Sequence, residues 1–149
     1  MTDFSKLDIL VLSYGTNDWA ASAISSDDAT TENPLGTTSS FGGALRYFLE
    51  TLWSSFPNIR VLIGGIIWRG NPVSGQLNTW SDQWYKDGKL IQDYNAVAKS
   101  IAENYHIPYL DLYNNLGCNH LNWLNFFNAS DGTHPNENGL TFMSKLYAD

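Results

Sequence analysis

The sequence is poor in cysteine, in basic residues and in long apolar runs, and each shortage excludes a class of protein. One cysteine in 149 residues, Cys118, leaves no internal disulfide framework and no multi-cysteine metal site. Eight Lys and Arg stand against 15 Asp and Glu, so the net charge of −7 would repel a phosphate backbone. No apolar run approaches the roughly 18 residues that span a bilayer. We therefore expect neither a nucleic-acid partner nor a membrane span.

Motifs for metals and cofactors are also missing. The sequence has three histidines, and no two of them have the spacing of metal ligands. His106 falls between an expected helix and an expected strand, where a helix C-terminal role is the natural interpretation. No glycine-rich phosphate loop opens either of the first two expected helices, since Gly42-Gly43 is too short a signal. The sequence predicts no metal and no cofactor.

What the sequence does contain is an alternation of strand and helix patterns. Hydrophobic residues make up 43% and charged residues 15%, which is typical of a folded chain, and 149 residues suit one domain. The order strand, helix, strand, helix, strand, helix predicts an α/β domain with a parallel sheet and right-handed crossovers. Strands are expected over 7–14, 59–63 and 107–112, helices over 41–56, over 89–105 and from Pro135 onward, and irregular segments over 22–40 and 69–85.

Polar motifs follow the expected strands. Gly15-Thr16-Asn17-Asp18 comes directly after the first strand, Trp68-Arg69 follows the second, and the segment from Asp131 to His134 follows the third after a longer loop. In open α/β sheets, active sites form at the carboxyl ends of the strands. We therefore expect these three segments to converge on one edge of the sheet.

Each motif alone has a functional and an ordinary interpretation. A serine hydrolase needs an imidazole that takes the nucleophile's proton and a carboxylate that orients it, and Asp131 and His134 lie three residues apart in a turn. Such a pair is more often a surface feature or a helix cap. The Asn17 amide fits a donor to a developing oxyanion, or a cap in a turn where Gly15 takes positive φ.

The combination is more specific than either part. A hydrophobic strand ending in Tyr14-Gly15-Thr16-Asn17-Asp18, with Asp131-Gly132-Thr133-His134-Pro135-Asn136 before the last helix, resembles the SGNH (GDSL-type) hydrolase family. The resemblance implies a flavodoxin-like, three-layer fold with helices on both faces of a parallel sheet. It implies ester hydrolysis of a small ester or an acylated carbohydrate, without a cofactor. It assigns Asn17 as oxyanion donor, His134 as general base and Asp131 as its orienting partner, with substrate contacts at Gly15, Asp18, Trp19 and Trp68.

The sequence departs from that family in its nucleophile. The family's serine lies in a Gly-Asp-Ser block after its first strand, and no such block occurs in these 149 residues. We expect residues 1–149 to form a single domain that corresponds to the C-terminal two-thirds of the family domain, with the first strands missing. The chain alone is then expected to have little or no activity. Poor substitutes for the nucleophile are Ser13, inside a strand, Ser130, in the turn itself, and the remaining candidates Ser5, Ser22, Ser25 and Ser26.

Two further expectations follow from this departure. In the family's sheet order the missing strands would lie beside 7–14, which would become an exposed apolar edge through which the chain self-associates. The alternative function is a non-catalytic carbohydrate-binding or interaction module on the same scaffold. That module would use aromatic rings in the loops, with Trp19, Trp68, Trp80, Trp84 and Trp123 as candidates. A nucleotide-binding flavodoxin-like domain also fits the alternation but lacks a phosphate loop.

Overall fold

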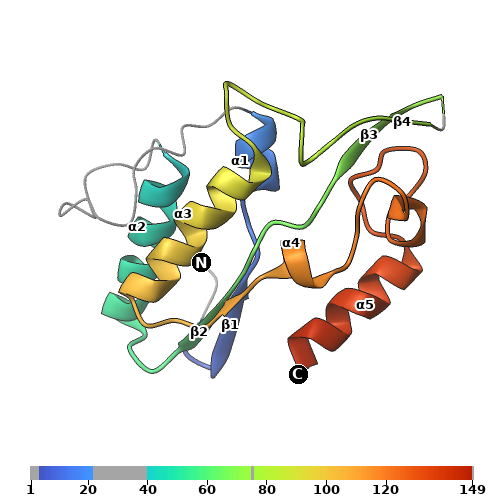
Figure 1. Ribbon diagram of the computed structural model, residues 1–149. Coiled ribbons are helices and arrows are strands. Elements are labelled where there is room, and N and C mark those ends of the chain that lie inside the picture. The colour runs from blue at the N-terminus through green and yellow to red at the C-terminus, as the bar shows by residue number, and fades with distance from the viewer. Residues whose placement is uncertain (1–3, 22–39, 75, 149) are drawn as a thin grey trace.

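Three parallel strands form the sheet at the centre of the molecule (Figure 1). They are β1 (Ile9–Leu12), β2 (Arg60–Gly64) and β5 (Tyr109–Leu110), in the spatial order β1-β2-β5. The computed structural model describes residues 4–21, 40–74 and 76–148. Within them the predicted α/β class and the parallel pairing are confirmed, although β1 and β5 are shorter than their apolar runs suggested.

Three long helices flank this sheet. Figure 1 shows α2 (Phe41–Ser55) and α3 (Ile91–Asn104) on one side of the strands and α5 (Glu137–Ala148) on the other. The predicted helices over 41–56 and 89–105 are thus confirmed. Helix α5 begins two residues after Pro135, because the Asn136 side chain accepts a hydrogen bond from the backbone N–H of Gly139 at 3.0 Å. Shorter helices are α1 (Thr16–Ala20), α4 (Leu112–Asn115) and the 3-10 turn η1 (Trp123–Asn125).

One predicted irregular segment is wrong. Over 69–85 the structure contains an antiparallel hairpin of β3 (Gly70–Val73) and β4 (Gln76–Trp80). A two-stranded ribbon has no strictly alternating buried face, and Pro72 within it argues against a strand, so the sequence signal is weak. The pairing register shifts between Asn71 and Pro72 to accommodate the proline. The predicted loop over 22–40 lies outside the described residues except for Ser40.

The core fills the space between the sheet and the pair α2 and α3. The inward side chains of the strands meet an apolar stripe on each helix. Trp19 of α1 and Trp68 after β2 are among the largest fully buried side chains. Strand and helix contributions to this core are Leu12, Val61, Ile63, Leu45, Leu49, Leu52, Ala98 and Ile101.

Strand β1 lies at an edge of the sheet and is not covered on both faces. It pairs with β2 among the described strands, and Ile9 and Val11 are 54% and 46% exposed. The apolar run over 7–14 also favoured a strand buried on both faces; the exposure of Ile9 and Val11 contradicts this, whereas the predicted apolar edge is present. An uncovered edge of this kind offers unpaired backbone groups to another strand. No helix in the described residues is long and apolar enough to cross a membrane.

We predict that two copies of this chain associate by pairing their β1 edges. Sedimentation of the wild-type chain at micromolar concentration should show a dimer that dissociates on dilution. Val11→Lys should shift the chain to monomer, because a charged side chain on an edge disfavours strand pairing. Val73→Lys is the matched control, since Val73 is a 56% exposed valine on β3. A wild-type chain that stays monomeric, or equal effects of both lysines, would contradict the prediction.

Candidate active site

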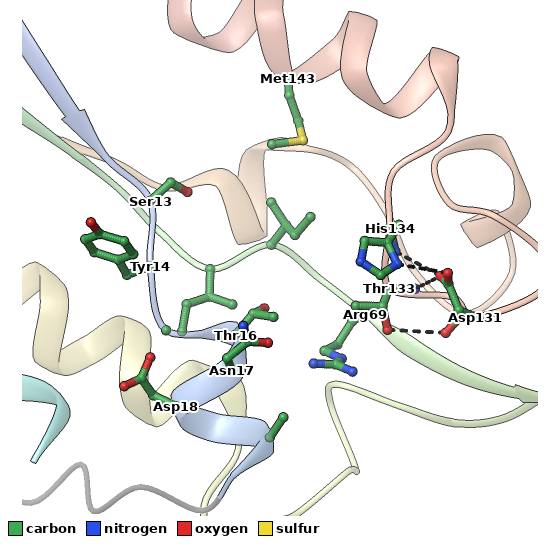
Figure 2. Close-up of a pocket in the computed structure, with 14 residues that line it drawn as sticks. Ser13, Tyr14, Thr16, Asn17, Asp18, Arg69, Asp131, Thr133, His134 and Met143 are labelled. Carbon is green, nitrogen blue, oxygen red and sulfur yellow. Dashed lines mark hydrogen bonds and ion pairs between the residues drawn. The ribbon is translucent and has the colours of Figure 1, made fainter.

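A cleft of about 540 Å³ opens at the carboxyl ends of β1 and β2. Segments from the beginning, middle and end of the described chain meet there, as the sequence predicted (Figure 2). Its polar and charged lining comes from the turn into α1, from the chain after β2 and from the turn before α5. These side chains are Ser13, Thr16, Asn17, Asp18, Arg69, Asp131, Thr133 and His134.

Gly15 makes the turn that brings Asn17 to the cleft. Its φ of +113° lies in the region that glycine alone adopts easily, and a Cβ there would lie 2.4 Å from Ile66 Cδ1. The chain therefore turns tightly against Ile66 and enters α1 at Thr16. Asn17 stands in the first turn of α1, exposed, and no hydrogen bond from the rest of the described chain occupies its side-chain amide. That amide is free to donate to a ligand.

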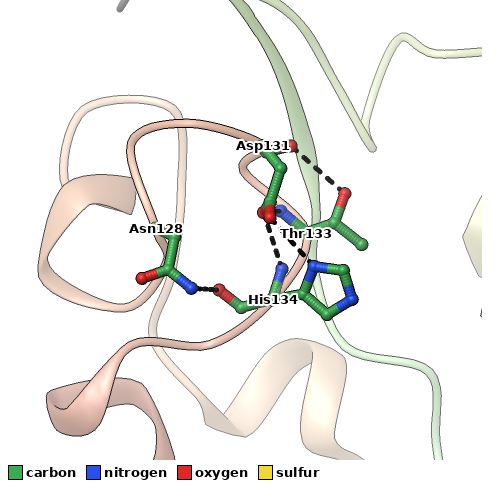
Figure 3. A network of polar contacts seen from close by, with 4 residues as sticks. All are labelled: Asn128, Asp131, Thr133 and His134. Atoms are coloured by element: carbon green, nitrogen blue, oxygen red, sulfur yellow. Dashed lines mark hydrogen bonds and ion pairs between the residues drawn. The ribbon is translucent and has the colours of Figure 1, made fainter.

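The Asp131 carboxylate holds both the turn and the His134 ring (Figure 3). One oxygen, Oδ1, accepts hydrogen bonds from the backbone N–H groups of Thr133 at 2.8 Å and His134 at 2.9 Å. The other, Oδ2, lies 2.9 Å from His134 Nδ1. These bonds, the backbone ones first, lower the pKa of Asp131 to about 2 from the usual 3.8.

The bonding of Asp131 decides which nitrogen of His134 can act as a base. An ionised carboxylate only accepts hydrogen bonds, so Nδ1 is the donor and a neutral ring carries its lone pair on Nε2. The His134 side chain is 77% exposed and that of Asp131 is 40% exposed. Such an exposed pair contributes little to stability, and what it does provide is a fixed ring orientation and tautomer.

Asn128 and Gly132 attach this turn to the rest of the protein. The backbone N–H and the side-chain Nδ2 of Asn128 both donate to the His134 carbonyl at 3.0 Å. Gly132 adopts a φ of +62°, and its carbonyl accepts from the Gly70 N–H at 2.8 Å. A Cβ at position 132 would lie 2.8 Å from the Gly70 carbonyl oxygen, so only glycine permits this close approach.

Asn95 of α3 holds the chain that follows β2. Its Oδ1 accepts from the Ile66 N–H at 2.7 Å and its Nδ2 donates to the Ile66 carbonyl at 2.9 Å. The Asn95 side chain is buried, so it takes the place of a neighbouring strand for a residue that has left the sheet. These two hydrogen bonds hold Ile66 in position, where it lines the cleft between Gly15 and Arg69.

Arg69 lines the cleft, although no role in the site was predicted for this residue from the sequence. Its guanidinium carbon lies 5.1 Å from the Trp19 ring centroid and 5.3 Å from that of Trp84. Its backbone N–H and carbonyl both bond the buried Ser81 hydroxyl at 2.7 Å. Burial lowers the pKa of Arg69, and the nearby Asp131 charge acts in the opposite direction. The available signal was the position of Arg69 directly after β2, at the strand end where the cleft opens.

The structure corrects two of the expected substrate contacts. Trp19 and Trp68 are 0% and 1% exposed and do not line the cleft, whereas the other two, Gly15 and Asp18, do. Trp19 stands two residues after Asn17 on α1, and two positions along a helix reach the opposite face. Trp68 points away from Arg69 because neighbouring residues of an extended chain alternate in direction.

The serines considered as substitute nucleophiles lie in different places. Ser13 follows the last residue of β1, so it is not inside the strand, and it is exposed on the cleft wall (Figure 2). Ser130 does not line the cleft, and Ser5 lies beside the α2–β2 connection. The other candidates, Ser22, Ser25 and Ser26, lie outside the described residues. The described residues contain no group of three or more His, Cys, Asp or Glu that could hold a metal ion.

Comparison with known proteins identifies the family. The family model for GDSL-like lipases and acylhydrolases matches residues 2–141. The chain belongs to this family. The resemblance inferred from the Asn17 and Asp131–His134 motifs is thereby confirmed, and with it the GDSL-hydrolase fold. No functionally curated protein matches the sequence.

Solved structures of other proteins share the fold over nearly the whole chain. A protein from Lactobacillus plantarum superposes with a TM-score of 0.78 at 21% identity, over 97% of this chain and 66% of its own. A GDSL-like lipase from Bacteroides thetaiotaomicron superposes with a TM-score of 0.58 at 20% identity, over 95% of this chain and 60% of its own. The chain thus spans less than two thirds of the length of either structure.

We expect Asn95→Ala to lower the free energy of unfolding by about 2 to 3 kcal/mol. The substitution leaves the buried N–H and carbonyl of Ile66 without partners, and each buried unpaired group costs about 1 kcal/mol or more. Urea denaturation followed by fluorescence measures the change. Glu103→Ala, at an exposed position of the same helix, is the control and should change stability by less than about 0.5 kcal/mol. Equal effects of the two variants would contradict the role assigned to Asn95.

The Asp131 turn should lose stability in acid, and Asp131→Asn should abolish that loss. Because the folded pKa of about 2 lies below the usual 3.8, ionised Asp131 stabilises the fold above about pH 4. This contribution disappears as the pH falls toward 2. Urea denaturation at a series of pH values should therefore show the stability of wild type and variant converging between about pH 5 and pH 2. A difference that stays constant over this range would show that Asp131 titrates normally.

Proposed function

We propose that this domain carries the oxyanion donor and the general base of a serine esterase that hydrolyses carboxylic esters. One observation carries the proposal: the free Asn17 amide and the Asp131–His134 pair line one cleft at the carboxyl ends of the strands. Residues 1–149 form one domain in this proposal, equivalent to the C-terminal two-thirds of the family domain. Asn17 donates to the oxyanion, His134 is the base and Asp131 orients it.

The chemistry follows from these positions. A serine oxygen attacks the ester carbonyl carbon while its proton moves to Nε2 of His134. The carbonyl oxygen becomes an oxyanion that accepts a hydrogen bond from the Asn17 amide. When the C–O bond to the alcohol breaks, His134 returns the proton to the leaving oxygen, and an acyl-serine remains. Water, deprotonated by the same nitrogen, then releases the acid and restores the serine.

The nucleophilic serine in this proposal comes from a segment outside these 149 residues. No Gly-Asp-Ser block occurs in the sequence, and no described hydroxyl is bonded to His134. The uncovered edge of β1 supports this placement. A strand added parallel to β1 would end on the same side of the sheet as Asn17 and His134, which is where the hydroxyl must arrive.

For the substrate we propose a small ester, with acetylated carbohydrates as one candidate class. The alternative, a non-catalytic carbohydrate-binding module, requires open ring faces in the loops. Trp19, Trp68 and Trp123 are buried, and His120 stacks on Trp80 at 4.7 Å. The Trp84 ring has Arg69 and Lys86 against it. Protein groups therefore occupy these rings, which favours the catalytic proposal.

A fluorophosphonate probe and an aryl-acetate assay test the proposal. The 149-residue chain should react with neither, and a form that also carries a Gly-Asp-Ser strand should hydrolyse aryl acetate. In that form Asn17→Ala should lower kcat about 100- to 1000-fold through loss of one oxyanion donor. His134→Ala should abolish activity.

The controls separate the parts of this proposal. Asn71→Ala, on β3 outside the cleft lining, should leave kcat unchanged. Probe labelling of Ser13 in the chain alone would move the nucleophile into this chain and contradict its external source. Hydrolysis that survives His134→Ala would contradict the assigned base.

A further inference from the structure

Arg69 stands out because it is a charged side chain of the cleft that the proposed chemistry does not use. Its guanidinium sits in the corner between the Trp19 and Trp84 rings, which meet edge to face at 90°. Its Nε is buried without a hydrogen-bond partner. Among the described residues no carboxylate lies within 4.0 Å of it, so no ion pair neutralises its charge.

The protein holds this side chain rigidly. The Ser81 hydroxyl bonds the Arg69 backbone on both sides, and the Trp19 indole N–H donates to the Lys89 carbonyl at 3.1 Å. The Gly70–Gly132 hydrogen bond ties the next residue to the turn that carries Asp131. The Arg69 backbone is therefore fixed relative to the Asp131–His134 pair, and the two indole rings restrict where its guanidinium can lie, which reduces the entropy lost on binding a ligand.

The guanidinium faces the part of the cleft where an ester would lie. In Figure 2 its terminal nitrogens lie between Asn17 and the Asp131 turn, and all three residues line the same cleft. The two indole rings close two sides of the group, so the terminal N–H groups on the cleft side remain for a ligand. A planar fork of donors fits a carboxylate, which accepts two parallel hydrogen bonds.

The charges of the cleft favour a ligand with one negative charge over a ligand with two. Asp18 and Asp131 also line it, and Asp131 is already bonded to His134 and to two backbone N–H groups. One cation beside two carboxylates gives these three groups a net charge of −1, so a carboxylate is held by the paired donors of the guanidinium and not by the overall charge of the cleft, and a phosphate dianion would meet stronger repulsion than a monoanion. We infer that Arg69 is a specificity-determining residue that binds one carboxylate of the substrate, which is then an ester with a carboxylate on its acyl or its alcohol part.

This inference rests on the proposed function, because only an esterase would make the bound ester a substrate. Its test measures binding and requires no turnover. The probes are matched pairs that differ by one charge, titrated into the 149-residue chain and followed by the indole N–H signals in NMR spectra. Monomethyl succinate against dimethyl succinate places the carboxylate on the acyl part. Acetoxyacetate against its methyl ester places it on the alcohol part. The pair with the larger difference identifies which part carries the charge.

The wild-type chain should bind the monoanion of at least one pair about 10-fold more tightly than its neutral partner. Arg69→Gln should abolish that preference, and Arg69→Lys, which keeps the charge but not the fork, should weaken it several-fold. Lys86→Gln is the matched control: it removes a cation that also lies on the Trp84 ring but outside the cleft, and the preference should persist.

Three results would overturn the inference: equal affinity for both members of each pair, a preference that survives Arg69→Gln, or one that Lys86→Gln also removes. If Arg69→Gln does not fold, judged by its near-ultraviolet circular dichroism, Arg69→Lys and the wild-type comparison still decide. Ester hydrolysis without any preference for a carboxylate would refute this inference alone. A carboxylate preference in a chain that never forms an esterase would refute the proposed function alone.

Discussion

The site depends on one close approach between two backbones. The Gly132 carbonyl accepts a hydrogen bond from the Gly70 N–H, and no side chain would fit between them. This contact joins the turn that carries Asp131 and His134 to the chain that leaves β2 with Arg69. Because the two segments are about sixty residues apart, the contact depends on the tertiary fold that brings them together. Local sequence makes the turn, and the tertiary fold gives it a position.

Hydrogen bonds on both sides of this contact hold the walls of the cleft in position. Asn95 fixes Ile66 through two hydrogen bonds, and Ile66 in turn packs against Gly15 at the entrance to α1. Asn128 fixes the carbonyl of His134 on the other side. Asn95, Asn128 and Gly15, which have no role in the proposed chemistry, thus help to determine where the Asn17 amide and the imidazole lie. Rigid support of this kind is what a site needs when it stabilises a transient charge.

Much of this arrangement could be read from the sequence, for physical reasons that particular residues illustrate. Apolar spacing identified α2 and α3, and the rule that strand ends carry chemistry brought Asn17, Asp131 and His134 to one edge. The direction in which a single side chain points was harder to predict from the sequence. Trp19 and Trp68 were expected to contact substrate, yet one position of helix rotation or strand alternation turned each toward the core. The hairpin was missed because a proline-containing ribbon gives little pattern, and the Gly132 contact lies beyond any local rule.

One added strand would account for both the exposed edge of β1 and the exposed His134 in the proposed enzyme. Ile9 and Val11 lie open to solvent on the strand that leads to the cleft, and the imidazole is 77% exposed at its end. An imidazole acts as a base on a serine when the hydroxyl is held at hydrogen-bond distance. Covering the β1 edge with a further strand would bury both the apolar side chains and one side of the cleft. In the proposed enzyme a single element would cover the apolar edge and bring the serine to the cleft, and this is why we place the nucleophile on it.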